Sequence, residues 1–189
     1  MSADRTALAP SGFDLIAVRI MEQRARRLAA SAAVADHDTT YEILVFRAGA
    51  ELYGLDLAFV AQVTKVGPLI QVPGAKPPFA GIFTLRGGIV SAFSLSQATG
   101  QAQKPITEHT RAIVCGTDIF RFALLADEVV QATSVQTGRL TPPESTAPLA
   151  GCTRGLTTTG IIVLDGDQLA KSGGPLFTGP DGPSTINRD

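Results

Sequence analysis

Short apolar runs of strand length, separated by Gly and Pro turns, are the feature that most constrains the fold of this chain. Residues 41–47 are mostly apolar, and in residues 53–57 Tyr and Leu alternate with Gly and Asp. Alternation with a period of two is typical of a β-strand with one buried face. A turn-forming Ala48-Gly49-Ala50 lies between the two runs. We therefore predict a pair of antiparallel strands here.

Further short apolar runs continue almost to the end of the chain, divided by turn signals such as Val72-Pro-Gly74 and Gly87-Gly88. Many short strands with regular Gly and Pro turns are typical of β-barrels and β-sandwiches. The fold class predicted for this part is therefore mainly β. The additional predicted strands are residues 60–66, 81–85, 89–95, 112–115, 119–125, 129–134 and 160–164.

A weak internal repeat relates the two halves of this β-region. The pattern in residues 43–63 returns in residues 112–130, with residues 53–57 answering to 120–124, an offset of 120 − 53 = 67 residues. Each half is too small to bury a large core alone. We therefore expect the halves to share a packed interface that forms a groove.

Residues 13–35 carry a helical pattern instead. Apolar side chains recur there at spacings of three and four, and Ser11 is a suitable N-cap. We predict an amphipathic, locally basic helix whose polar face is solvated while it docks on a barrel. Sealing an edge strand or binding a membrane surface or another partner are alternatives. The apolar stripe consists of Leu15, Val18, Met21, Ala25, Leu28 and Ala32.

These differences in residue pattern divide the chain into three predicted parts. Residues 1–40 form an N-terminal extension, residues 41–171 a β-domain, and residues 172–189 a Gly- and Pro-rich tail that is expected to fray.

Composition narrows the function classes. Charged residues make up 17% of the chain and the formal net charge is −1, which disfavours nucleic-acid binding, since that depends on neutralising phosphates. The apolar runs are far shorter than a membrane span, so we expect a soluble protein. The first residues lack an apolar run of the export type, which favours the cytoplasm.

No residue pattern points to catalysis, a metal or a cofactor. His37 and His109 stand in polar loops without metal-ligand spacing, and Cys115 and Cys152 are not part of a Cys-x-x-Cys motif. We expect solvated histidines and inert, unpaired thiols. The carboxylates are scattered singly along the strands, so an enzyme built on a pair of them is a remote alternative. The function class predicted from the residues is therefore a β-protein that binds other proteins. The second candidate is a barrel that binds a small ligand or nucleic acid.

The strand order and turn residues together resemble the CheW family, the adaptor proteins of bacterial chemosensory arrays. The resemblance runs from about residue 41 to residue 171, and the Gly81–Gly87 segment is its strongest part. Its motifs are Ile43-Leu-Val-Phe46, Tyr53-Gly-Leu-Asp-Leu57, Val60-Ala-Gln-Val63, Val72-Pro-Gly74, Gly81-Ile-Phe-Thr-Leu-Arg-Gly87 and Leu125-Ala-Asp127.

This resemblance implies two intertwined five-stranded SH3-like barrels with a hydrophobic groove between them, and no catalytic activity. It implies an adaptor that links receptors to a CheA-type histidine kinase. One barrel face would pair with the regulatory domain of the kinase, and the groove would receive the cytoplasmic tip of a chemoreceptor. Such a protein is recruited to receptor arrays at the membrane without being embedded there.

The family motifs supply five candidate binding residues. Val60, Val63, Gly81 and Arg86 are the receptor-side candidates, and Gly87 shapes the turn that presents Arg86. Each has a simpler interpretation: the two valines as core residues, and Gly81 as a point of close backbone approach. Arg86 is the strongest candidate because a charge beside Gly-Gly at a strand end needs solvent, an acid or a partner.

The sequence departs from the family pattern after this turn. The family continues with a Pro and then an Asp-Leu-Arg triplet, whereas this chain has Ser91 and then Ser94-Leu95-Ser96; Thr84 replaces the usual Asn. If the missing acid and base form an ion pair, losing both leaves neither charge unpaired. If they contact partners, this chain serves a divergent, non-chemotaxis chemosensory pathway.

Overall fold

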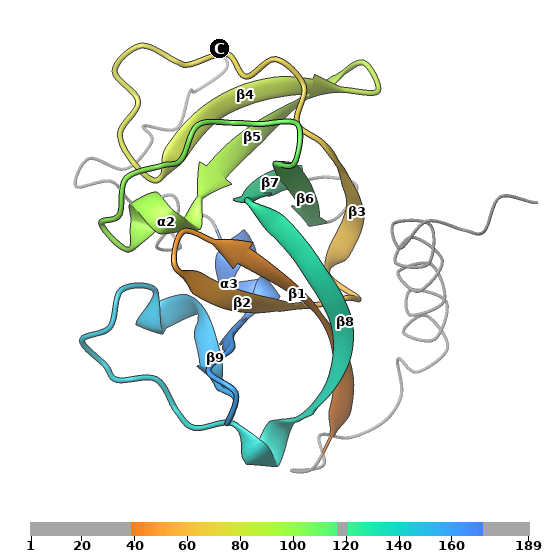
Figure 1. Cartoon of the computed structure of the whole chain (residues 1–189), viewed down its shortest axis with the longest axis vertical. Coiled ribbons are helices and arrows are strands. Elements are labelled where there is room, and N and C mark those ends of the chain that lie inside the picture. Colours follow the sequence, from red (N-terminus) through yellow and green to blue (C-terminus); the bar gives the residue numbers. More distant parts are fainter. Residues whose placement is uncertain (1–38, 117–120, 172–189) are drawn as a thin grey trace, which may run out of the picture.

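A computed structural model describes residues 39–116 and 121–171 (Figure 1). The predicted helix in residues 13–35 and the predicted tail from residue 172 lie outside the described residues. The division of the chain into three parts therefore stays a prediction.

The described residues form strands joined by tight turns and by longer loops, with a few helical turns. Each predicted strand is present, although β7 is described only from Arg121. Thr153–Leu156 (β9) was missed because four residues with one large apolar side chain give no alternation. The elements in chain order are β1 (Thr40–Ala48), β2 (Glu51–Asp56), β3 (Val60–Lys65), β4 (Phe79–Leu85), β5 (Gly88–Ser94), α2 (Leu95–Ala98), β6 (Arg111–Gly116), β7 (Arg121–Ala126), β8 (Glu128–Gln136), η1 (Thr137–Arg139), η2 (Ala150–Cys152), β9 (Thr153–Leu156), β10 (Ile162–Leu164) and α3 (Gly166–Ala170).

The strands form two five-stranded sheets that exchange a strand. Barrel A has the order β8-β1-β2-β10-β9, and barrel B has the order β3-β6-β7-β5-β4. The predicted β1–β2 hairpin is confirmed by its antiparallel register. After each hairpin the chain crosses over: β3 leaves β2 to join barrel B, and β8 leaves β7 to join barrel A. The halves are therefore intertwined.

The strand registers confirm the internal repeat but correct its offset. In barrel A Leu44 pairs with Leu55, and in barrel B Ile113 pairs with Leu124, so the offset is 124 − 55 = 69 residues. A slip of two residues keeps every side chain on the same face of a strand, so alternation alone did not expose the error. At the corrected offset residues 60–66 (VAQVTKV) align with 129–135 (VVQATSV).

Each barrel is closed by a single β-bridge in the segment that follows the exchanged strand. Ile70 bridges Ile82 of β4 in barrel B, and Thr141 bridges Leu156 of β9 in barrel A. These closures complete the mainly β fold of two five-stranded barrels that was predicted.

The largest apolar core lies between the barrels. This central core takes buried side chains from both sheets, including Leu44 and Tyr53 of barrel A and Leu124 of barrel B. The Phe93 and Phe122 rings meet edge to face within it, 6.1 Å apart. Smaller cores fill the barrels: the barrel A core contains Ile43, Val45, Ile161 and Val163, and the barrel B core contains Phe83, Val90, Ala92, Ala112, Val114, Ala123 and Leu125.

Candidate protein-binding site

The turn between β4 and β5 presents an arginine at the tip of a hairpin. Leu85 pairs with Gly88, so Arg86 and Gly87 form a two-residue loop. Their φ angles are +50° and +81°, the left-handed values of a type I′ turn, which matches the twist of paired strands. Arg86 is exposed. The predicted turn is confirmed, and Figure 1 shows this hairpin at the upper end of the molecule.

Large apolar side chains lie exposed beside this turn. Ile89 is 74% exposed and Ile70 is 60% exposed. Thr84 pairs with Ile89 across the hairpin, and Ile82 bridges Ile70. Paired residues share a face, and so do residues two apart on one strand. Ile70, Ile82, Thr84 and Ile89 therefore form one surface, which we call the hairpin face.

The hairpin face continues the surface that packs between the barrels. Ile89, Ser91 and Phe93 alternate along β5 and so point to the same side, and Phe93 belongs to the central core. The buried interface thus continues to the exposed surface as a strip that is apolar at Phe93 and Ile89 and polar at Ser91 between them. Ile70 and Ile89 were not among the predicted binding residues, although the alternation in residues 89–95 indicates a strand with two distinct faces.

The five predicted binding residues differ in exposure. Val60 has no exposed surface and lies in the central core, and Val63 packs against that core. Both are on β3, while Gly81, Arg86 and Gly87 belong to the β4–β5 hairpin, and the Ile70–Ile82 bridge joins the segment after β3 to β4. Only Arg86 and Gly87 lie at the exposed tip.

Gly81 is buried where a backbone passes close by. Its φ is +142°, and a Cβ at this position would lie 2.6 Å from the carbonyl oxygen of Ile70. Any side chain would therefore push the closing bridge of barrel B apart. This is the close-approach role that the sequence analysis weighed for Gly81.

The serines that depart from the family pattern bond to each other. The Ser94 and Ser96 hydroxyls are buried and 2.9 Å apart. Ser94 also caps α2, since its Oγ accepts from the Gln97 N–H at 3.4 Å. This strand end is therefore held by neutral hydrogen bonds, and the loss of an acid and a base leaves no unpaired charge there.

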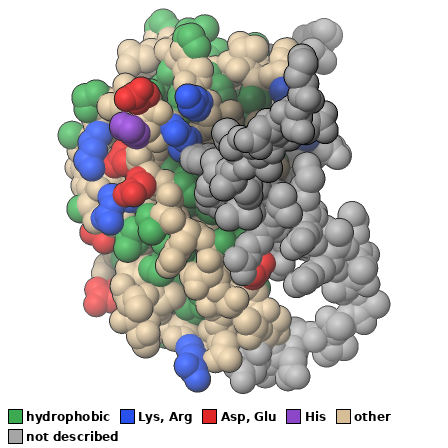
Figure 2. Space-filling model, turned by 45° about the vertical axis from the view of Figure 1, so that its right-hand side comes forward, with side chains coloured by type: hydrophobic (Ala, Val, Ile, Leu, Met, Phe, Trp, Pro, Cys, Tyr) green, Lys and Arg blue, Asp and Glu red, His purple; other side chains and the backbone are tan. Residues whose placement is uncertain are grey.

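A cleft of about 380 Å³ lies between β1 and β8 of barrel A and the start of β6 in barrel B, and its lining is charged rather than apolar. Arg47 Nε is 3.8 Å from Glu128 Oε2, and Lys104 Nζ is 3.1 Å from Asp127 Oδ2. Figure 2 shows basic and acidic side chains gathered around a histidine on this face. The hydrophobic groove expected between the barrels does not correspond to this cleft.

The thiols and the described histidine match their predictions. Cys115 and Cys152 are unpaired and buried, and burial raises the pKa of Cys152 to about 12. His109 is 79% exposed. Within residues 39–116 and 121–171 no group of His, Cys, Asp and Glu could hold a metal ion. Among the helices that can be described, none is long and apolar enough to cross a bilayer.

Comparison with known proteins places this architecture in a family. The sequence model of the CheW-like domain matches residues 42–173, more than half of the chain. The chain belongs to the CheW-like domain family. The match takes in both barrels, and with them the exchanged strands and the hairpin face.

Two CheW proteins show how far the likeness extends. Chemotaxis protein CheW from Treponema pallidum (strain Nichols) is 34% identical over 62 residues, which span 33% of this chain and only 36% of that protein. The crystal structure of scaffolding protein TtCheW from Thermoanaerobacter tengcongensis matches with a TM-score of 0.60 and 24% identity, covering 70% of this chain and 89% of that one. The second likeness supports the CheW fold.

Proposed function

We propose that this chain is a non-catalytic adaptor of the cytoplasm that couples chemoreceptors to a CheA-type histidine kinase. Membership of the CheW-like domain family supports the proposal, and so does the fold shared with a scaffolding protein. The chain would act by holding partners together rather than by chemistry.

The observation that carries this proposal is the hairpin face with a cation at its tip. A strip that continues a buried interface, with the apolar Ile89 largely exposed, is typical of a surface that another protein covers. Arg86 adjoins the strip and supplies a charge that selects among partners by electrostatic complementarity.

Titration calorimetry with two partners tests the function. The full chain is titrated separately with the regulatory domain of the kinase and with a cytoplasmic receptor fragment. Binding to both is expected, and no binding to either at tens of micromolar by the folded chain would overturn the proposal.

Ile89→Ser locates the surface in the same assay. Loss of a buried apolar contact should weaken binding to one partner by about tenfold or more. Ile106→Ser is the matched control, because Ile106 is also exposed, at 39%, but lies in the loop before β6. Equal weakening by both variants would argue against the hairpin face.

The serine departures favour a second version of this function. With Ser94 and Ser96 in place of an acid and a base, this strand end is neutral and its two hydroxyls are buried against each other. The same adaptor would then serve a chemosensory pathway other than chemotaxis. Deleting the gene and tracking swimming behaviour separates the two versions, because only the chemotaxis version predicts loss of directed swimming.

A further inference from the structure

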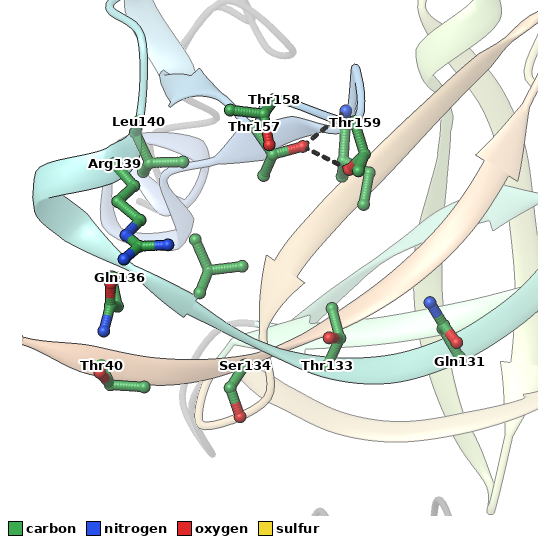
Figure 3. A pocket seen from close by; sticks show the side chains of 12 residues that line it. Thr40, Gln131, Thr133, Ser134, Gln136, Arg139, Leu140, Thr157, Thr158 and Thr159 are labelled. Carbon is green, nitrogen blue, oxygen red and sulfur yellow. Dashed lines mark hydrogen bonds between the residues drawn. The ribbon is translucent and has the colours of Figure 1, made fainter.

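A cavity opens on barrel A at a place where barrel B carries a buried aromatic side chain. A cavity of about 500 Å³ opens between β8, η1 and the turn that joins β9 to β10. Most of its lining is polar, but Val135, Leu140 and Ile161 also line it, and all three belong to or pack against the barrel A core. Figure 3 shows Thr157, Thr158 and Thr159 facing Leu140 and Arg139 across this space. The cavity is thus an entrance to the interior of barrel A.

Comparison of the two barrels shows which side chain barrel A lacks. Leu156 and Ile82 each make the closing bridge of their barrel, so the residues that follow them, Thr157 and Phe83, are equivalent. Phe83 is 2% exposed and sits in the barrel B core. In contrast, the Thr157 hydroxyl accepts from the Ile161 N–H at 3.0 Å and holds a tight turn. An aromatic side chain in barrel B therefore has no counterpart in barrel A.

The N-terminal segment of the chain joins the described residues at the rim of this cavity. The carbonyl oxygen of Thr39 accepts from the Thr137 N–H at 3.1 Å and from the Thr137 hydroxyl at 2.8 Å. Thr137 opens η1, which lines the cavity, and Thr40 is itself a lining residue. Thr39, to which residue 38 is joined, therefore lies beside the opening.

The tether is short enough to favour docking within one molecule. Only residues 36–38 separate the predicted amphipathic segment, residues 13–35, from Thr39. A fully extended chain spans about 3.5 Å per residue, so the end of that segment stays within roughly 15 Å of the rim. Such a tether holds a segment near its site at about millimolar effective concentration.

The charges and side-chain types on the two sides suit docking of residues 13–35 in this cavity. Arg139 is the sole charged side chain among the described residues that line the cavity. Asp36 and Asp38 lie three residues and one residue before Thr39 in the sequence and carry the opposite charge. The predicted stripe that includes Val18, Met21 and Leu28 supplies apolar side chains for the place that Phe83 fills in barrel B.

We propose that the cavity of barrel A is the docking site for this chain's own residues 13–35. Their apolar side chains complete the barrel A core, and Asp36 and Asp38 pair with Arg139 at the rim. The segment is thereby an internal element of the fold and not a second partner-binding arm.

Hydrogen exchange on the full chain tests the docking. Val18→Gln with Met21→Gln removes two apolar side chains of the stripe without changing a barrel residue. Exchange at the Leu140, Thr157 and Gly160 amides should then become faster by about fivefold or more, because the cavity rim loses its cover. The matched control is Arg19→Gln with Arg24→Gln, which lies off the stripe and should leave these rates unchanged. Equal rates in the wild type and the stripe variant would overturn the proposal.

A second variant fills the cavity with a larger side chain from barrel A itself. Thr157→Phe places in barrel A the side chain that barrel B already holds, so residues 13–35 should be displaced and trypsin should cut faster after Arg24, Arg26 and Arg27. The wild-type cleavage rate should not change on about tenfold dilution, since docking is intramolecular. Cleavage unchanged by Thr157→Phe, or protection lost on dilution, would overturn the proposal, the latter in favour of a second copy. If Thr157→Phe does not fold, the stripe variants decide alone.

Discussion

Gly81 of β4 and Gly155 of β9 are structural equivalents, and each faces the carbonyl oxygen of the residue that closes its barrel. A Cβ on Gly81 would lie 2.6 Å from the Ile70 oxygen, and a Cβ on Gly155 would lie 2.8 Å from the Thr141 oxygen. Gly155 belongs to no candidate binding site. The close approach that it shares with Gly81 therefore serves the fold and not partner binding. Gly81 is therefore required by barrel closure.

Replacing either glycine by alanine should destabilise the fold. Gly81→Ala should cost about 2 kcal/mol or more, because it combines a steric clash with a positive φ, and Gly155→Ala should cost less because it meets the clash alone. Urea unfolding measures both. Gly151→Ala, with open space around its Cβ, should be nearly neutral. A neutral Gly81→Ala would refute the closure role.

Arg86→Asn should separate turn geometry from charge. Asn tolerates the positive φ of this position, so the free energy of unfolding should change by less than about 0.5 kcal/mol. Binding to the partner that covers the hairpin face should weaken and lose part of its salt dependence. Arg86→Val serves as the contrasting variant, because a β-branched residue strains the turn and should lower stability. Unchanged binding by Arg86→Asn would remove Arg86 from the site.

Leu55 and Leu124 are equivalent, fully buried residues of the central core, one in each barrel. Leu→Ala at either position should cost about 3 kcal/mol, since it leaves a cavity shared by both barrels. Both variants should still unfold in one transition, followed by circular dichroism and by a probe in either barrel. Two separate transitions would show that the barrels are independent units, and the exposed Ile106→Ala should be nearly neutral.

The buried thiols should make the fold sensitive to alkaline pH. Burial raises the pKa of Cys152 from 9.0 to about 12, and it raises the pKa of Cys115 as well. Above about pH 9 the unfolded chain loses these protons while the folded chain keeps them, so stability falls as pH rises from about 9 towards 12. Tyr41 and Tyr53, whose pKa values burial also raises, act in the same direction above about pH 10.

Cys115→Val with Cys152→Ala isolates the thiol contribution. This variant should lose less stability between about pH 9 and 10, measured by urea unfolding at each pH, than the wild type. An identical decline in both proteins would assign the alkaline loss to other groups.

The sequence predicted most strands because alternation and turn residues are local signals. Residues 41–47 and 53–57 formed the predicted hairpin, and Arg86-Gly87 formed the predicted turn. The β9 strand was not predicted because its formation depends on pairing with β10, about ten residues later. The strand exchange was expected from family resemblance, and only the registers fixed which strands cross.

The candidate site was harder to predict because exposure depends on tertiary packing. Val60 and Ile89 look alike in the sequence, as valine and isoleucine near the start of short apolar runs. In the fold Val60 is covered by both barrels, while Ile89 extends past the central core and is largely exposed. The cavity of barrel A became informative only when the closing bridges of the two barrels set Thr157 against Phe83.

The exchange of β3 and β8 also sets the order in which a growing chain can complete its barrels. The outer edge of β1, the first strand in the described part of the chain, has no neighbour until Glu128–Gln136 has been made. Until then a nine-residue strand that includes Ile43 and Phe46 offers its free edge to other nascent chains. Truncation before β8, or a pause in translation there, should therefore produce aggregates rather than a half-sized protein.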